Sequence, residues 1–158
     1  MKTRLLIATI CAIALSATLS VSAAKKEKKD PLAGIKCPVS GKPIKAASFL
    51  KHNGGKVYFC CDNCPKAFAK NTAKYTAKAN QQLYATKQAK LVKCPFTGKK
   101  LNGKTVIDVA GTKVCFCCDK CKAGALKAEG DARLALVFGE KSFAKGFKVA
   151  SKQDKSSK

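Results

Sequence analysis

The chain has 158 residues, ten cysteines, two arginines and a formal net charge of +23. With His52 as its only histidine, the sequence offers no convincing Ser–His–Asp or Cys–His catalytic arrangement, and we expect no enzyme. The positive charge is almost all lysine, whereas specific phosphate recognition favours arginine, so we expect no sequence-specific nucleic-acid binding.

Residues 1–23 have the pattern of a signal peptide. Lys2 and Arg4 precede an apolar run at 5–19, and Val21-Ser22-Ala23 places small residues before a cleavage point. The alternative is a membrane anchor, but the run is shorter than the ~20 residues that a span needs. We therefore expect an exported protein, periplasmic or secreted, with no transmembrane segment after cleavage. A charged leader follows at 24–34.

Two cysteine motifs recur with one constant shift of 57 residues. Cys37 and Gly41 return as Cys94 and Gly98. The later cysteines Cys60, Cys61 and Cys64 return as Cys117, Cys118 and Cys121. Because two separated motifs keep the same register, a whole unit has been duplicated.

The first unit predicts a tight turn at 37–41, strands at 44–51 and 56–59, and a helix whose N-cap is Asp62. Residues 70–90 predict a second, longer helix, with Tyr75, Ala79 and Leu83 on one apolar stripe. The second unit predicts strands at 105–109 and 113–116. A helix at 119–127 capped by Asp119 follows, then a short helix from Asp131 and a last one at 142–149.

These elements predict an α+β fold. It consists of two small β-hairpin-plus-helix modules, at 35–90 and 91–150, of which the first includes a connecting helix. The tail at 151–158 is polar, and we expect it to be disordered.

Each module gathers thiols in a pattern typical of a metal site. Thiolate sulfur forms closed tetrahedral cages around Zn²⁺ and also suits Cu(I). A hairpin separates the first cysteine from the later ones, which is the layout of a zinc ribbon or treble-clef-like knuckle. The predicted metal ligands are Cys37, Cys60, Cys61, Cys64, Cys94, Cys117, Cys118 and Cys121. Zn²⁺ is the favoured ion, with Cu⁺ as the alternative.

The spacing of these cysteines, with Tyr58-Phe59 before the second one, resembles the TRASH and YHS domains. The resemblance covers residues 37–68 and 94–125 and implies heavy-metal handling. Many relatives have Cys-x-x-Cys at the first knuckle, where this chain has Ser40 and Thr97, and the Tyr-His-Ser triplet is absent.

The identity of the fourth ligand in each metal site is therefore open. Cys61 and Cys118 are the candidates, or they are small core residues and each site has three thiolates. Cys64 and Cys121 fall in a first helical turn, which predicts a lowered pKa. Cys115, whose place in the first module is held by Tyr58, is either an extra ligand or a buried thiol, and we favour the thiol.

The function that we expect is metal binding, for sequestration and trafficking or as a structural staple, with a metal-donor or metal-acceptor protein as a candidate partner. The alternative is a secreted basic interaction protein that binds polyanionic surfaces non-specifically, with purely structural cysteines held by zinc or disulfides. A dithiol oxidoreductase is less favoured, because Cys61-x-x-Cys64 lacks a βαβ context.

Overall fold

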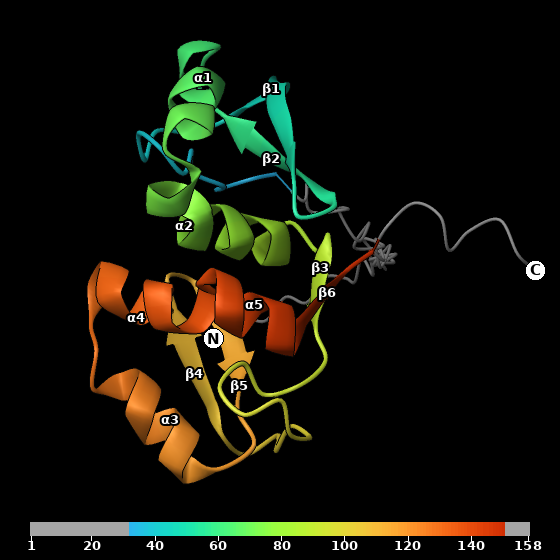
Figure 1. Cartoon of the computed structure of the whole chain (residues 1–158), viewed down its shortest axis with the longest axis vertical. Coiled ribbons are helices and arrows are strands. Elements are labelled where there is room, and N and C mark those ends of the chain that lie inside the picture. Colours follow the sequence, from blue (N-terminus) through green and yellow to red (C-terminus); the bar gives the residue numbers. More distant parts are fainter. Residues whose placement is uncertain (1–31, 151–158) are drawn as a thin grey trace, which may run out of the picture.

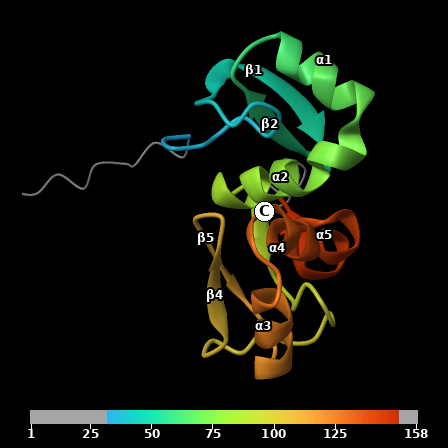
Figure 2. The ribbon, with the colours of Figure 1, turned by 90° about the vertical axis from the view of Figure 1, so that its left-hand side faces the viewer.

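The computed structural model of the protein describes residues 32–150. The predicted signal peptide, most of the charged leader and the tail at 151–158 lie outside them. The described part is α+β: small two-stranded antiparallel sheets combined with helices. In Figures 1 and 2, one hairpin and its helix lie at each end of the molecule, and helices α2, α4 and α5 lie between them.

The first unit consists of β1 (Lys45–His52), β2 (Gly55–Phe59), α1 (Asn63–Lys70) and α2 (Thr72–Ala85). The turn between β1 and β2 has positive φ at Asn53 and Gly54, as expected where an Asn-Gly pair closes a two-residue hairpin. The pairing of β1 with β2 is interrupted by an irregularity between Lys45 and Phe49.

The second unit consists of β4 (Val106–Val109), β5 (Thr112–Cys115) and α3 (Asp119–Leu126). Two further helices follow, α4 (Gly130–Phe138) and α5 (Glu140–Gly146). A third small sheet pairs β3 (Ala89–Leu91) with β6 (Phe147–Val149), and so joins the end of the first unit to the end of the chain.

Two predicted helices are wrong in extent. The second helix, expected at 70–90, begins at Thr72 instead, because Asn71, with a φ of −145°, ends α1 and its side chain caps α2 by accepting from the Lys74 N–H. Its last residues form β3 instead. The helix expected at 142–149 ends at Gly146, and Phe147 begins β6, because β3 offers this segment a strand to pair with.

The predicted N-caps are confirmed in position for Asp62 and wrong for Asp119. Asp62 holds the N-cap position of α1, but its side chain makes no capping hydrogen bond and its backbone is already helical. Asp119 is the first residue of α3, and Cys118 occupies the N-cap position. Acidic side chains placed there still favour the positive end of the helix dipole.

Equivalent phenylalanines anchor both hairpins in the core. Phe59 and its counterpart Phe116 are fully buried. Phe59 packs edge-on against Phe68 of α1, with ring centroids 5.6 Å apart, and Phe116 packs against Phe96 at 5.3 Å. The predicted stripe on α2 is also internal, since Ala79 and Leu83 are fully buried. Burying aromatic rings in this way dominates the stability of so small a core.

Helix α2 carries buried polar side chains that tie the two units together. The amide of Asn80 accepts a hydrogen bond from the Asn53 side chain and donates one to the Phe138 carbonyl oxygen, both at 2.9 Å. Gln82 is also buried and bonds to the backbone of Tyr58. Among residues 32–150, no helix is long and apolar enough to cross a membrane.

Candidate metal centres

The first cysteine of each module lies in a tight knuckle with the same geometry. The Cys37 N–H donates to the Lys42 carbonyl at 2.8 Å, and the Gly41 N–H donates back to the Cys37 carbonyl at 2.9 Å. The equivalent bonds at Cys94 measure 2.9 and 2.8 Å. Gly41 and Gly98 both have φ of +71°, a conformation that glycine adopts without strain. The knuckle therefore places both thiols in the same way.

In each module the structure brings three cysteine sulfurs together. The Sγ atoms of Cys37, Cys60 and Cys64 all lie within 4.8 Å of one another, as do those of the second cluster. The second cluster consists of Cys94, Cys117 and Cys121. The Cys60–Cys64 distance is 3.6 Å and the Cys117–Cys121 distance is 3.7 Å. Sulfurs at 2.3 Å from a tetrahedral zinc lie about 3.8 Å apart, so these clusters could hold a metal ion.

Cys61 and Cys118 lie beside the clusters without completing them. The Cys61 sulfur is 3.8 Å from that of Cys60 and 3.5 Å from that of Cys64, and the Cys118 sulfur is 3.7 Å from that of Cys117. Neither belongs to the groups that contain the knuckle cysteines, which are Cys37 with Cys60 and Cys64, and Cys94 with Cys117 and Cys121. Cys61 and Cys118 are partly buried, as are Cys60 and Cys117, whereas Cys64 and Cys121 are buried.

A hydroxyl group adjoins each cluster on the side of the knuckle. The Ser40 Oγ lies 3.1 Å from the Cys60 sulfur, and the Thr97 Oγ1 lies 3.2 Å from the Cys117 sulfur. The sequence shows a hydroxyl at the same register in both repeats, which is the signal that could have identified Ser40 and Thr97 as part of the sites.

The knuckle also prepares its cysteine as a thiolate. Burial alone would raise the pKa of Cys37, but hydrogen bonds from the Ser40 hydroxyl and from nearby backbone N–H groups outweigh it and lower the pKa to about 7. Cys94 has the same balance, with Thr97 in the place of Ser40, and its pKa is also lowered to about 7. A thiolate is the form that binds metal.

A lowered pKa was expected for Cys64 and Cys121, in the first helical turn, but it is found three residues earlier, at Cys61 and Cys118. Burial raises the pKa of Cys64 to about 12 and also raises that of Cys121, and the neighbouring thiols add to the effect. The backbone N–H groups at the start of the helix instead reach the preceding cysteines. Hydrogen bonds from the N–H groups of Cys64 and Cys121 lower the pKa of Cys61 and of Cys118 respectively.

The remaining candidate residues lie apart from the clusters. The Cys115 thiol donates to the Asn102 carbonyl oxygen at 2.9 Å and belongs to neither sulfur group. His52, the only histidine, is the last residue of β1, and its ring packs edge-on against Phe68 at 5.2 Å. Its Nε2 is buried without a hydrogen-bond partner in the described part of the chain.

The nine described cysteines are all free thiols. The short sulfur–sulfur distances of 3.5–3.8 Å far exceed the ~2.05 Å of a disulfide bond. Comparison with family models, with curated proteins and with solved structures gives no match for this chain. The two sulfur clusters themselves are therefore the features of this chain that point to a function.

Proposed function

We propose that this protein is an exported metal-binding protein in which each module holds one thiophilic ion, Zn²⁺ first and Cu⁺ as the alternative. The observation that carries the proposal is the recurrence of a three-sulfur cluster, built on the same knuckle and the same helix start, in both repeats. The resemblance of the cysteine spacing to TRASH and YHS domains supports a role in heavy-metal handling. The proposal includes no enzymatic activity.

The donor set favours a site that can release its ion. Three sulfurs with a neutral hydroxyl beside them leave one coordination position without a thiolate, whereas structural zinc sites have four closed protein ligands. Cys61 and Cys118 lie against the later two cysteines and could replace a ligand during exchange. We therefore place sequestration and transfer of the ion, to or from a partner protein, ahead of a purely structural staple.

Native mass spectrometry of the protein isolated from the exported fraction tests the metal content. We expect two ions of one element per chain, and one ion fewer in each of Cys37→Ser and Cys94→Ser. Mild chelation then separates the two roles. A transfer site gives up its ion while the circular dichroism spectrum stays folded, whereas loss of structural zinc unfolds the chain. A preparation that contains disulfides and no metal would contradict both roles.

The second candidate function is a secreted basic interaction protein whose cysteines only hold the fold together. The surface charge favours it: Lys78–Asp131, with 2.8 Å between Nζ and Oδ2, is the one ion pair recorded in residues 32–150. Most lysines are thus free to bind polyanions. Retention on heparin that is unchanged by metal removal, together with an ion that no competing thiol extracts, would favour this function.

A further inference from the structure

The outer edge of β5 has backbone groups without partners. In the β4–β5 hairpin the residues nearest the turn, Val109 and Thr112, are opposite each other, and the Phe116 N–H bonds to the Thr105 carbonyl farther along. Hydrogen-bonded and non-hydrogen-bonded pairs alternate in an antiparallel ladder, so Lys113 and Cys115 direct their backbone groups away from β4. Within residues 32–150, the N–H of Lys113 and both backbone groups of Cys115 have no recorded hydrogen bond.

In the first module the same edge is closed by two glutamine side chains. The counterparts of Lys113 and Cys115 are Lys56 and Tyr58. The Gln88 amide bonds to both the N–H and the carbonyl of Lys56 at 2.7 Å, and the Gln82 amide bonds to those of Tyr58 at 2.6 and 2.9 Å. These amides act as a substitute strand along β2. On the outer edge of β5, among the residues that the structure describes, only the Lys113 carbonyl has a partner, the Tyr84 hydroxyl at 2.9 Å.

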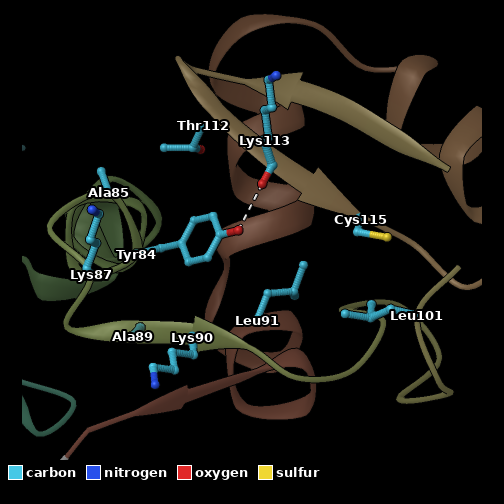
Figure 3. A pocket seen from close by; sticks show the side chains of 10 residues that line it. All are labelled: Tyr84, Ala85, Lys87, Ala89, Lys90, Leu91, Leu101, Thr112, Lys113 and Cys115. Carbon is cyan, nitrogen blue, oxygen red and sulfur yellow. Dashed lines mark hydrogen bonds between the residues drawn. The ribbon is translucent and has the colours of Figure 1, made fainter. Parts of the chain in front are cut away.

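A groove of about 700 Å³ lies beside this open edge of β5. Figure 3 shows Tyr84 reaching across it to Lys113, and Leu91 of β3 pointing toward β5. Its apolar lining includes Leu91 and Leu101, whereas its charged lining residues are all lysines, namely Lys87, Lys90 and Lys113. The groove therefore combines unpaired strand hydrogen bonds, apolar surface and positive charge.

We propose that the edge of β5 binds an extended, acidic segment of a partner protein as an added β-strand. An exposed edge of this kind is a template for strand addition, in which main-chain hydrogen bonds give affinity and side-chain pockets give specificity. Carboxylates on the segment complement the lysines, and its apolar residues contact Leu91 and Leu101. A second copy of the chain fits less well, because its β5 would bring another Lys113 to the same edge.

Binding there would place the partner beside the second metal site but not the first. Cys115 is two residues from Cys117 along the chain, and its counterpart Tyr58 is covered by Gln82. The docking surface does not depend on the metal, since it consists of backbone groups and lysines. Failure of metal binding and failure of peptide binding are therefore separate results.

The test uses the mature chain labelled with ¹⁵N and a pentapeptide of alternating glutamate and valine. We expect the peptide to shift the amide signals of Lys113 and Cys115 and to slow their hydrogen exchange. Methylation of the peptide nitrogens on one edge should weaken binding about ten-fold, since each lost hydrogen bond costs about that factor. Lys90→Glu should weaken it as well, and Lys66→Glu, the same charge change on α1, should not.

Gln88→Ala supplies a second readout, because it exposes the Lys56 edge in the first module. We expect the peptide then to shift Lys56 as well as Lys113. The proposal is overturned if the peptide does not bind, if it binds with no shift at β5, or if the methylated peptide binds equally well. It is also overturned if sedimentation shows a dimer whose contact protects β5, because the occupant is then a second copy.

Discussion

Each module contains its own three-sulfur cluster, but the two modules differ in how their hairpins are held. In the first, Gln82 of α2 bonds to the backbone of Tyr58 and also donates to the Lys36 carbonyl at 3.0 Å, so the hairpin and the knuckle strand are both fixed to the helix. In the second, Gln81 and Tyr84 of α2 each donate one bond to the hairpin, to the Ala110 and Lys113 carbonyls, and the Thr105 hydroxyl of the hairpin's own loop donates to the Phe116 carbonyl at 2.6 Å. The cluster needs only a knuckle, a hairpin and a helix start. Docking onto α2 is a separate feature.

The largest effect should come from removing one knuckle cysteine. We expect Cys37→Ser to weaken metal binding in the first module by at least about 100-fold, since outer-shell changes alone cost 10–100-fold, and to leave the second module loaded. Native mass spectrometry with a competing chelator measures this. Cys115→Ser is the matched control and should retain both ions. Loss of both ions from Cys37→Ser would show that the modules are not independent.

Next in size is the loss of the glutamine that holds the first hairpin. Gln82→Leu removes three hydrogen bonds and leaves buried backbone groups unpaired, which should lower the free energy of unfolding by about 3 kcal/mol. Urea denaturation gives the value, and hydrogen exchange should rise in β2 more than in β5. Gln81→Leu, which loses one bond to the Ala110 carbonyl, is the control and should cost about 1 kcal/mol or less. Equal losses of stability in the two variants would argue against a special role of Gln82 in holding the first hairpin.

The hydroxyl beside each cluster should set the pH dependence of metal binding. Ser40→Ala removes a hydrogen bond that lowers the pKa of Cys37, so this pKa should rise above about 7. Near pH 7 the variant then holds more thiol, and a metal must displace an extra proton. Its affinity should fall about ten-fold at pH 7 and recover as the pH rises past the new pKa.

Thiolate absorbance titrations and zinc competition at several pH values measure both quantities. Ser40→Cys is the complementary variant, because it supplies a fourth thiolate and should bind zinc more tightly than the parent. A Ser40→Ala variant whose affinity deficit is the same at every pH would show that the hydroxyl does not act through Cys37.

A smaller gain should follow from giving the second hairpin the turn residue of the first. Ala110 has a φ of +51°, a conformation that costs an L-residue roughly 1–2 kcal/mol, whereas its counterpart Asn53 tolerates it better. We expect Ala110→Asn to raise the stability by about 0.5–1 kcal/mol by thermal denaturation. The reverse change, Asn53→Ala, should destabilise, because it also breaks the bond to Asn80. No gain in Ala110→Asn would mean that the turn relaxes at no cost.

The smallest expected effect is on the stability at mildly acidic pH. Burial lowers the pKa of His52, so the unfolded chain binds a proton that the folded chain resists. This contribution to stability is present above the unfolded value of about 6.5 and is lost as the pH falls through the lowered folded pKa. His52→Val, which copies the counterpart Val109, should flatten the change in melting temperature between neutral and mildly acidic pH. An unchanged slope would assign the dependence to another group.

The repeat predicted the hairpins and the three-sulfur grouping well, because a constant register fixes both the strand spacing and the helix start. Periodicity could not predict the pairing of β3 with β6, since it depends on contacts between residues 56 to 60 positions apart in the chain. The pKa of Cys64 was predicted in the wrong direction, because burial outweighs the helix dipole there. The roles of Gln82 and Gln88 have no local signature in the sequence.

The two hydrogen bonds of the Asn80 side chain couple the movements of the two units. One side-chain amide spans from the tip of the first hairpin to the carbonyl that ends α4, so either neighbour can shift only by giving up a bond that water cannot readily replace in the interior. Cutting the chain into separate halves would leave this amide half-satisfied in one fragment. The duplicated units thus no longer form a divisible pair.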